Sequence, residues 1–151
     1  MAKSKIEYSY ELYIAAPAAK VWNGLVDGAL TRQYVYGTRF TGTLEKGAPY
    51  AFVGDGDFKV VDGEILDVAP GKHLAISWSA HWSDAVAKDR ASRVRYELLP
   101  SGPNATRLRV VHDDFDGETA TYRESVAGWS LMMSSLKTLL ETGKPLAVEG
   151  A

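Results

Sequence analysis

The sequence has 151 residues, of which 46% are hydrophobic and 24% are charged, as in an ordinary globular domain. The net charge of −2 comes without a basic stripe, so we expect no nucleic-acid partner. Because the chain contains no cysteine, disulfides, thiolate catalysis and cysteine-ligated zinc are excluded. We expect one domain over residues 1–151, with a core large enough to fold without a metal or a disulfide.

The chain carries no pattern typical of a secreted or membrane protein. Residues 1–5 contain two lysines and lead into an alternating polar segment, without an apolar leader core behind them. The longest apolar runs fall far short of a bilayer span. These observations predict a cytoplasmic protein without a membrane partner.

The first segment alternates between apolar and polar residues over 6–14, which predicts a half-buried strand. Pro17 follows and suits the first turn of a helix. Val21, Trp22 and Leu25 then recur at helical spacing, which predicts one short helix. A second helical turn is expected over residues 29–34.

The middle of the chain predicts a meander of strands. Short turns about every ten residues favour antiparallel neighbours. Gly63 is a candidate site for a bulge, and the polar residues 80–91 are expected to form an irregular loop or a wide turn. The expected strands cover residues 39–44, 49–53, 58–68, 73–79, 92–99 and 106–113.

The C-terminal part carries the clearest helical pattern of the sequence. Thr121 and Glu124 have the spacing of a capping box at its start, and Gly143 is a normal stop. Gly128 is unfavourable inside a helix, so we expect the backbone of another element to approach it closely. The apolar stripe consists of Tyr122, Val126, Trp129, Met133, Leu136 and Leu140.

Strands followed by a long helix predict an α+β fold, in which a curved antiparallel sheet wraps around the C-terminal helix and two short helices follow the first strand. A more specific assignment rests on Ala16–Pro17 with Val21–Trp22, on His112–Phe115, on Gly128–Trp129 and on residues 136–143. With them, the chain resembles START-like (helix-grip) proteins, and within these the branch named after the activator of the heat-shock-protein-90 ATPase. Members of that branch often carry an aromatic pair after the second helix, where this chain has residues 33–36.

The resemblance implies a cavity between the bent sheet and the helix, which in this fold holds lipids, sterols, polyketides or hormones. Aromatic rings with polar tips suit a ligand that is mostly apolar and has one or two hydrogen-bonding groups. The alternative is that the same side chains fill an ordinary core. Residues that share a face with the expected cavity are the ligand-binding candidates, and they are Tyr10, Leu12, Phe52, Trp78, Tyr96, Val110, Trp129 and Met133.

His112 is the one candidate for catalysis. It shares the apolar face of its strand, and Asp113 and Asp114 follow it, so a carboxylate could orient its imidazole as a general base. The commoner role of a histidine at the end of a strand is to cap the following loop. The three histidines lack the spacing of a metal site, so we expect no metal and no cofactor.

Three functions from different classes remain open. The first is binding of a small apolar molecule, the second a cyclase-like or aromatase-like reaction in the same pocket, and the third a chaperone cofactor, as the family name implies. We expect them in that order, and the lack of the additional N-terminal domain of the eukaryotic activators counts against the third. A homodimer is compatible with the sequence.

Overall fold

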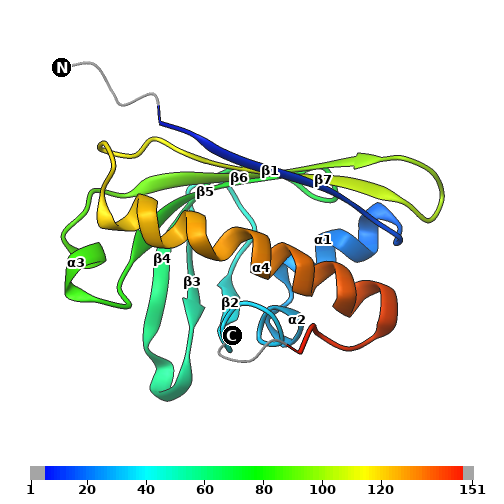
Figure 1. The fold of residues 1–151 in the computed structure, drawn as a ribbon, viewed down its shortest axis with the longest axis horizontal. Coiled ribbons are helices and arrows are strands. Elements are labelled where there is room, and N and C mark those ends of the chain that lie inside the picture. Colours follow the sequence, from blue (N-terminus) through cyan, green and yellow to red (C-terminus); the bar gives the residue numbers. More distant parts are fainter. Residues whose placement is uncertain (1–5, 148–151) are drawn as a thin grey trace.

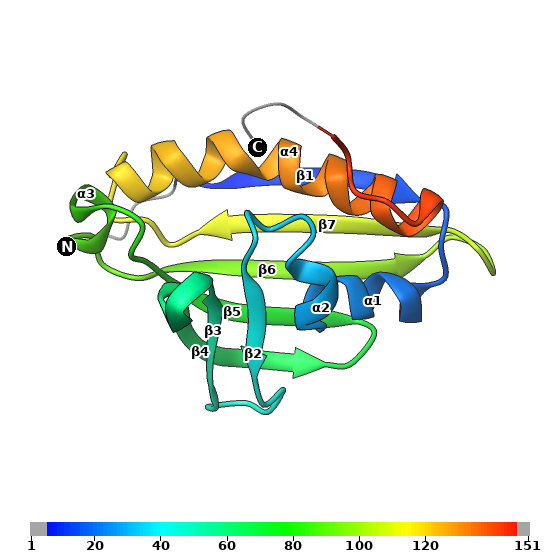
Figure 2. The same ribbon diagram turned by 90° about the horizontal axis from the view of Figure 1, so that it is seen from below.

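A computed structural model describes residues 6–147 and places a long helix, α4, across one face of a curved antiparallel sheet (Figures 1 and 2). The seven strands pair in the order β1-β7-β6-β5-β4-β3-β2. The predicted α+β helix-grip architecture is therefore confirmed, with α1 and α2 as the two short helices after β1. The elements are β1 (Tyr8–Ile14), α1 (Ala18–Val26), α2 (Gly28–Thr31), β2 (Arg39–Gly42), β3 (Pro49–Val53), η1 (Asp55–Asp57), β4 (Lys59–Ala69), β5 (His73–Ala80), α3 (Asp84–Ala87), β6 (Ser92–Pro100), β7 (Thr106–Asp113) and α4 (Ala120–Thr142).

The sheet buries one face because apolar residues alternate with polar ones along its strands. In β5, Leu74, Ile76 and Trp78 are buried in the core. The bulge in β4 lies between Ile65 and Asp67, so its predicted position at Gly63 was wrong. Glycine is needed at position 63 for another reason, since a side chain there would collide with the carbonyl group of Ser77 on β5.

Helix α4 covers the inner face of the sheet, as the apolar stripe predicted. Trp129, Met133, Leu136 and Leu140 are all buried along it. At its C-terminus, Gly143 adopts a φ of +86°, a left-handed conformation that glycine takes without strain.

The capping box of α4, predicted to begin at Thr121, was placed two residues too late in the sequence. Thr119 caps the helix, because its Oγ1 accepts a hydrogen bond of 3.1 Å from the backbone N–H of Tyr122. Thr121 instead lies inside the first turn and is buried. It donates from its backbone N–H and from its hydroxyl to Asp89, at 2.8 and 2.7 Å. The sequence pattern did not distinguish these two threonines.

Other boundaries differ in small ways from the predicted ones. Strand β2 ends at Gly42 instead of at residue 44, and β5 extends to Ala80. The stretch 80–91 contains the one-turn helix α3, which Ser83 caps by accepting from Val86 N–H. Within residues 6–147, no helix is long and apolar enough to cross a bilayer. The prediction drawn from the absence of a leader core rests on residues 1–5, which lie outside the described part.

Candidate functional site

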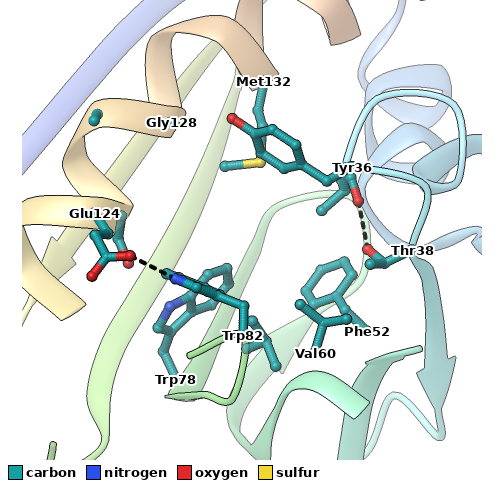
Figure 3. A pocket seen from close by; sticks show the side chains of 13 residues that line it. Tyr36, Thr38, Phe52, Val60, Trp78, Trp82, Glu124, Gly128 and Met132 are labelled. Carbon is teal, nitrogen blue, oxygen red and sulfur yellow. Dashed lines mark hydrogen bonds between the residues drawn. The ribbon is translucent and has the colours of Figure 1, made fainter. Parts of the chain in front are cut away.

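A cavity of about 520 Å³ opens between the inner face of β3, β4 and β5 and the N-terminal half of α4 (Figure 3). The segment that joins α2 to β2 forms its third side. The surface that the lining side chains present to it is almost entirely apolar. They are Val35, Tyr36, Thr38, Phe52, Val60, Val61, Trp78, Trp82, Glu124, Ser125, Ala127, Gly128 and Met132.

The inner wall of the cavity is rigid because it belongs to the packed core. Phe52 lies 6.1 Å from Trp78, measured between ring centroids, and both side chains are buried. Trp78 also packs against Trp129 of α4, with centroids 5.6 Å apart. Met132 adds an unbranched, adaptable side chain from the helix. Such a wall can receive an apolar ligand without first rearranging.

Two aromatic side chains that line the cavity are partly exposed instead of packed in the core, and they flank its mouth. Trp82 is 38% exposed and donates from Nε1 to Oε1 of Glu124 over 3.0 Å. Tyr36 is 56% exposed, and its backbone φ of +47° is uncommon for a residue with a side chain. Figure 3 shows the Tyr36 ring reaching from its loop toward Gly128 and Met132 of α4.

The Tyr36 side chain approaches α4 at Gly128, and the reason for a glycine at this position differs from the predicted one. A Cβ atom at this position would lie 3.2 Å from the hydroxyl oxygen of Tyr36 and 3.8 Å from the terminal methyl of Met132. No backbone atom of another element is among its nearest neighbours, so the predicted close approach of backbone was wrong. The bare helix surface at Gly128 instead forms part of the cavity wall.

Besides Tyr36 and the hydrogen-bonded pair of Trp82 and Glu124, three lining side chains carry polar atoms. Thr38 donates from Oγ1 to the carbonyl oxygen of Val35 over 2.7 Å, so it is satisfied (Figure 3). Trp78 and Ser125 are only 4% and 5% exposed. Their Nε1 and Oγ atoms are buried and have no hydrogen-bond partner within residues 6–147.

The eight predicted ligand-binding residues fall into three groups. Phe52 and Trp78 line the cavity. Tyr10 and Leu12 lie on β1 and are half-buried against the edge of the core. The other four are buried in the core without lining the cavity, and they are Tyr96, Val110, Trp129 and Met133.

Sequence reasoning missed Tyr36, Trp82, Glu124 and Gly128 as lining residues. Alternation along strands and helical spacing find side chains that face the core, whereas Tyr36 and Trp82 lie in loops, where neither period applies. One signal for Tyr36 was present, because residues 33–36 differ from the aromatic pair common in the resembled branch. The glycine in the middle of an apolar stripe was a signal for Gly128.

His112 is fully buried in β7 and does not line the cavity. Its Nε2 lies 2.7 Å from Oγ of Ser92, and its Nδ1 accepts from Nε1 of Trp129 over 3.1 Å. Burial lowers the pKa of His112 to about 3, although the negative charge of Asp113 acts in the opposite direction. The prediction that His112 caps the following loop was therefore wrong. A neutral imidazole with hydrogen bonds at both ring nitrogens is unsuited to accept a proton from a ligand.

The carboxylate expected to orient His112 has another task. Asp113 accepts hydrogen bonds from Nε and Nη2 of Arg93, at 2.9 and 2.8 Å, and from Nη2 of Arg95 at 3.2 Å. These hydrogen bonds lie on the outer face of the sheet and hold the pKa of Asp113 below its usual value, against the opposing effect of burial. No group of three histidine, aspartate or glutamate side chains in the described range could hold a metal ion.

The fold and this cavity define a START-like, helix-grip protein. Residues 15–141 match the model of the family described as "Activator of Hsp90 ATPase homolog 1-like protein", so the chain belongs to that family. No curated protein matched the sequence.

Solved structures with the same fold include proteins from different bacteria and one from a biosynthetic locus. Protein MLL2253 from Mesorhizobium loti is 26% identical, with a TM-score of 0.74 over 90% of this chain and 97% of that one. DynU16, from the dynemicin biosynthetic locus, is 26% identical with a TM-score of 0.73, over 94% of this chain and 49% of DynU16. The Aha1 dimer from Colwellia psychrerythraea is 18% identical with a TM-score of 0.72, over 92% and 98% of the two chains, which shows the fold alone.

Proposed function

We propose that this protein binds a small, mostly apolar molecule in the cavity between β3–β5 and α4. The observation that carries the proposal is a cavity of about 520 Å³ with a lining that is almost entirely apolar. Sites for small molecules are typically concave, apolar and roughly 300–1,000 Å³ in volume, with a few polar groups that orient the ligand. This cavity meets each of those criteria.

A cyclase-like reaction in the same cavity is the second candidate, and the occurrence of DynU16 in a biosynthetic locus is the observation in its favour. The titratable side chains among the described lining residues are Tyr36 and Glu124. Glu124 is already bonded to Trp82, and His112 lies outside the cavity. We therefore expect His112→Gln to leave the affinity for apolar probes within about tenfold, and the wild type to show no turnover that depends on this histidine.

A chaperone cofactor would need a surface for a protein partner, and the family name is the argument for it. The cavity is not required for that function.

A cytoplasmic location remains part of the proposal. A homodimer also remains part of it, since the dimer of the Colwellia psychrerythraea protein shares the fold. Light scattering coupled to gel filtration would measure the oligomeric state directly.

Native mass spectrometry of protein purified from its own host tests the binding proposal. We expect a fraction of the wild-type protein to carry a small-molecule adduct that organic solvent extracts. Gly128→Leu, which places a side chain in the cavity, should carry none. Ser130→Leu is the matched control, because Ser130 lies on an exposed face of the same helix and should keep the adduct. An adduct of equal abundance in all three proteins would place the ligand elsewhere and contradict the proposal.

A further inference from the structure

A second cavity, of about 300 Å³, borders the same segment between α2 and β2 as the first cavity does. The first cavity borders α4 from Glu124 to Met132, and the second borders it from Leu131 to Ser135, so the two follow each other along the helix. Within residues 6–147, Tyr36 is the one residue that lines both cavities. Tyr36 therefore stands where the two cavities meet.

The side chain of Tyr36 crosses from this segment to the helix. Its hydroxyl oxygen lies 3.2 Å, and its ring atom Cε2 3.8 Å, from the point where a Cβ atom on Gly128 would lie. Because Gly128 has no side chain, the end of the ring can reach the surface of α4. Figure 3 shows the ring extended toward Gly128 and Met132. The ring thus spans the distance between the segment and the helix, with one cavity on each side.

The backbone, and not a hydrogen bond, directs this ring toward the helix. Tyr36 and Gly37 have φ values of +47° and +75°, so two consecutive residues are left-handed, which is unfavourable for a tyrosine. The Tyr36 hydroxyl makes no hydrogen bond with residues 6–147, whereas the buried Tyr34 donates to the carbonyl oxygen of Gly24 over 2.7 Å. An unfavourable conformation at an exposed tyrosine, which the core does not need, points to a role at the site.

We propose that Tyr36 sets the length of the ligand. Its ring closes the first cavity toward the second, so the site holds a compact apolar molecule and disfavours a longer one of the same width. This inference rests on the proposed binding function, and it adds the size class of the ligand and the residue that determines it. Among the described lining residues of the first cavity, Glu124 carries the one charge, so neutral hydrocarbons test length without a contribution from ligand charge.

The rigid rods trans-stilbene and 1,6-diphenylhexatriene provide the test, because they share phenyl ends and differ in the length of the polyene between them. Displacement of N-phenyl-1-naphthylamine fluorescence measures both affinities, and the quantity compared is the ratio of the affinity for the long rod to that for the short rod. Tyr36→Ala should raise this ratio by about tenfold or more, since each methylene-sized group newly buried tightens binding about fourfold. Tyr36→Phe keeps the ring and should keep the ratio of the wild type.

Matched controls separate the partition from a general loosening of the fold. Tyr13→Ala removes a tyrosine that is equally exposed, at 59%, but lines neither cavity, and it should leave the ratio unchanged. Adding Leu131→Trp to Tyr36→Ala fills the second cavity from α4 and should restore the ratio of the wild type. Tyr36→Ala should unfold within about 2 °C of the wild type, because it loses no hydrogen bond to the described residues. Tyr36→Gly, which relieves the left-handed φ, is a second variant without the ring.

The outcomes distinguish failure of the inference from failure of the proposed function. Saturable binding of stilbene with the same ratio in the wild type, Tyr36→Ala and Tyr36→Gly would overturn the role of Tyr36 while apolar binding stands. A ratio raised equally in Tyr36→Phe or in Tyr13→Ala would also contradict the assignment to this ring, as would a raised ratio that Leu131→Trp leaves intact. The absence of saturable binding of either rod to the wild type would overturn the proposed function, and the inference with it.

Discussion

The indole of Trp129 donates a hydrogen bond from Nε1 to Nδ1 of His112, over 3.1 Å in the buried core. Since the indole nitrogen can only donate, Nδ1 must be the unprotonated acceptor, and the proton of the neutral imidazole must sit on Nε2. Nε2 then donates to Oγ of Ser92 over 2.7 Å. One pair of side chains thus ties α4 to β7 and fixes the tautomer of the histidine.

The first prediction concerns pH. His112 has a pKa of about 3 in the folded protein and an ordinary value of 6.5 in the unfolded chain. Between these two pH values the unfolded chain binds a proton that the folded protein does not. His112 therefore does not lower the free energy of unfolding above about pH 6.5, and this free energy falls as the pH is lowered below that value. The loss approaches roughly 1.4 kcal/mol per pH unit well below pH 6.5.

Urea unfolding of the wild type and of His112→Gln at several pH values from about 7.5 to 5.5 measures this effect, because carboxylates stay ionised there. Glutamine can accept from Trp129 and donate to Ser92, but it does not titrate. The variant should therefore lose less stability on acidification than the wild type. Parallel pH dependences for the two proteins would mean that His112 keeps an ordinary pKa.

A second prediction concerns Trp129, which is 1% exposed and packs against the rings of Trp78, Tyr96 and His112. Trp129→Ala should lower the free energy of unfolding by about 3–5 kcal/mol, since it leaves a cavity and removes the donor to His112. Trp82→Ala is the control and should cost at most about 1 kcal/mol, because Trp82 is partly exposed. Equal losses in the two variants, measured by urea unfolding, would contradict the packing described.

The third prediction concerns Gly128→Ala. Replacing a glycine inside a helix by alanine gains about 1 kcal/mol, and the added methyl makes one tight contact, of 3.2 Å, with the hydroxyl of Tyr36 at the end of an exposed side chain. We expect the free energy of unfolding to stay equal or to rise by up to about 1 kcal/mol. A loss of more than about 1 kcal/mol in thermal or urea unfolding would show that Tyr36 cannot yield.

A fourth prediction concerns Asp89, whose carboxylate accepts from the backbone N–H and the hydroxyl of Thr121. Asp89→Ala should cost about 1–2 kcal/mol, as the loss of a helix cap does, because it leaves a first-turn N–H unsatisfied and leaves the buried hydroxyl only its longer hydrogen bond, of 3.5 Å, to the carbonyl oxygen of Val86. Asp116→Ala changes an exposed aspartate in the loop before α4 and should leave the free energy of unfolding within about 0.5 kcal/mol. Similar losses for both substitutions would remove any special role for Asp89.

The fold was predictable because its signals are periodic. The alternation in β5 and the four-and-three spacing around Trp129 each identify an element and its buried face. The details that failed depend on contacts between distant segments. The sequence around Thr121 does not predict its hydrogen bond to Asp89, which is 32 residues away in sequence. Equally, the bulge beside Ile65 follows from how β4 fits β5.

The candidate site was only partly accessible to the same reasoning. Phe52 and Trp78 line the cavity and were found because they alternate on strands. Trp129 shares their pattern but is covered on all sides, and spacing cannot separate a side chain that fills the core from one that borders a cavity. Tyr36 and Trp82 lie in loops, so only the tertiary structure brings them to the mouth.

The most direct test of the central claim is a fluorescence titration with N-phenyl-1-naphthylamine, a neutral probe that brightens in apolar sites. The account predicts saturable binding to the wild type and to Ser130→Leu with equal affinity. It predicts at least a tenfold loss in Gly128→Leu, whose side chain occupies the cavity wall beside Met132. Equal affinity in all three proteins, each shown by circular dichroism to be folded, would contradict the claim that this cavity is the binding site.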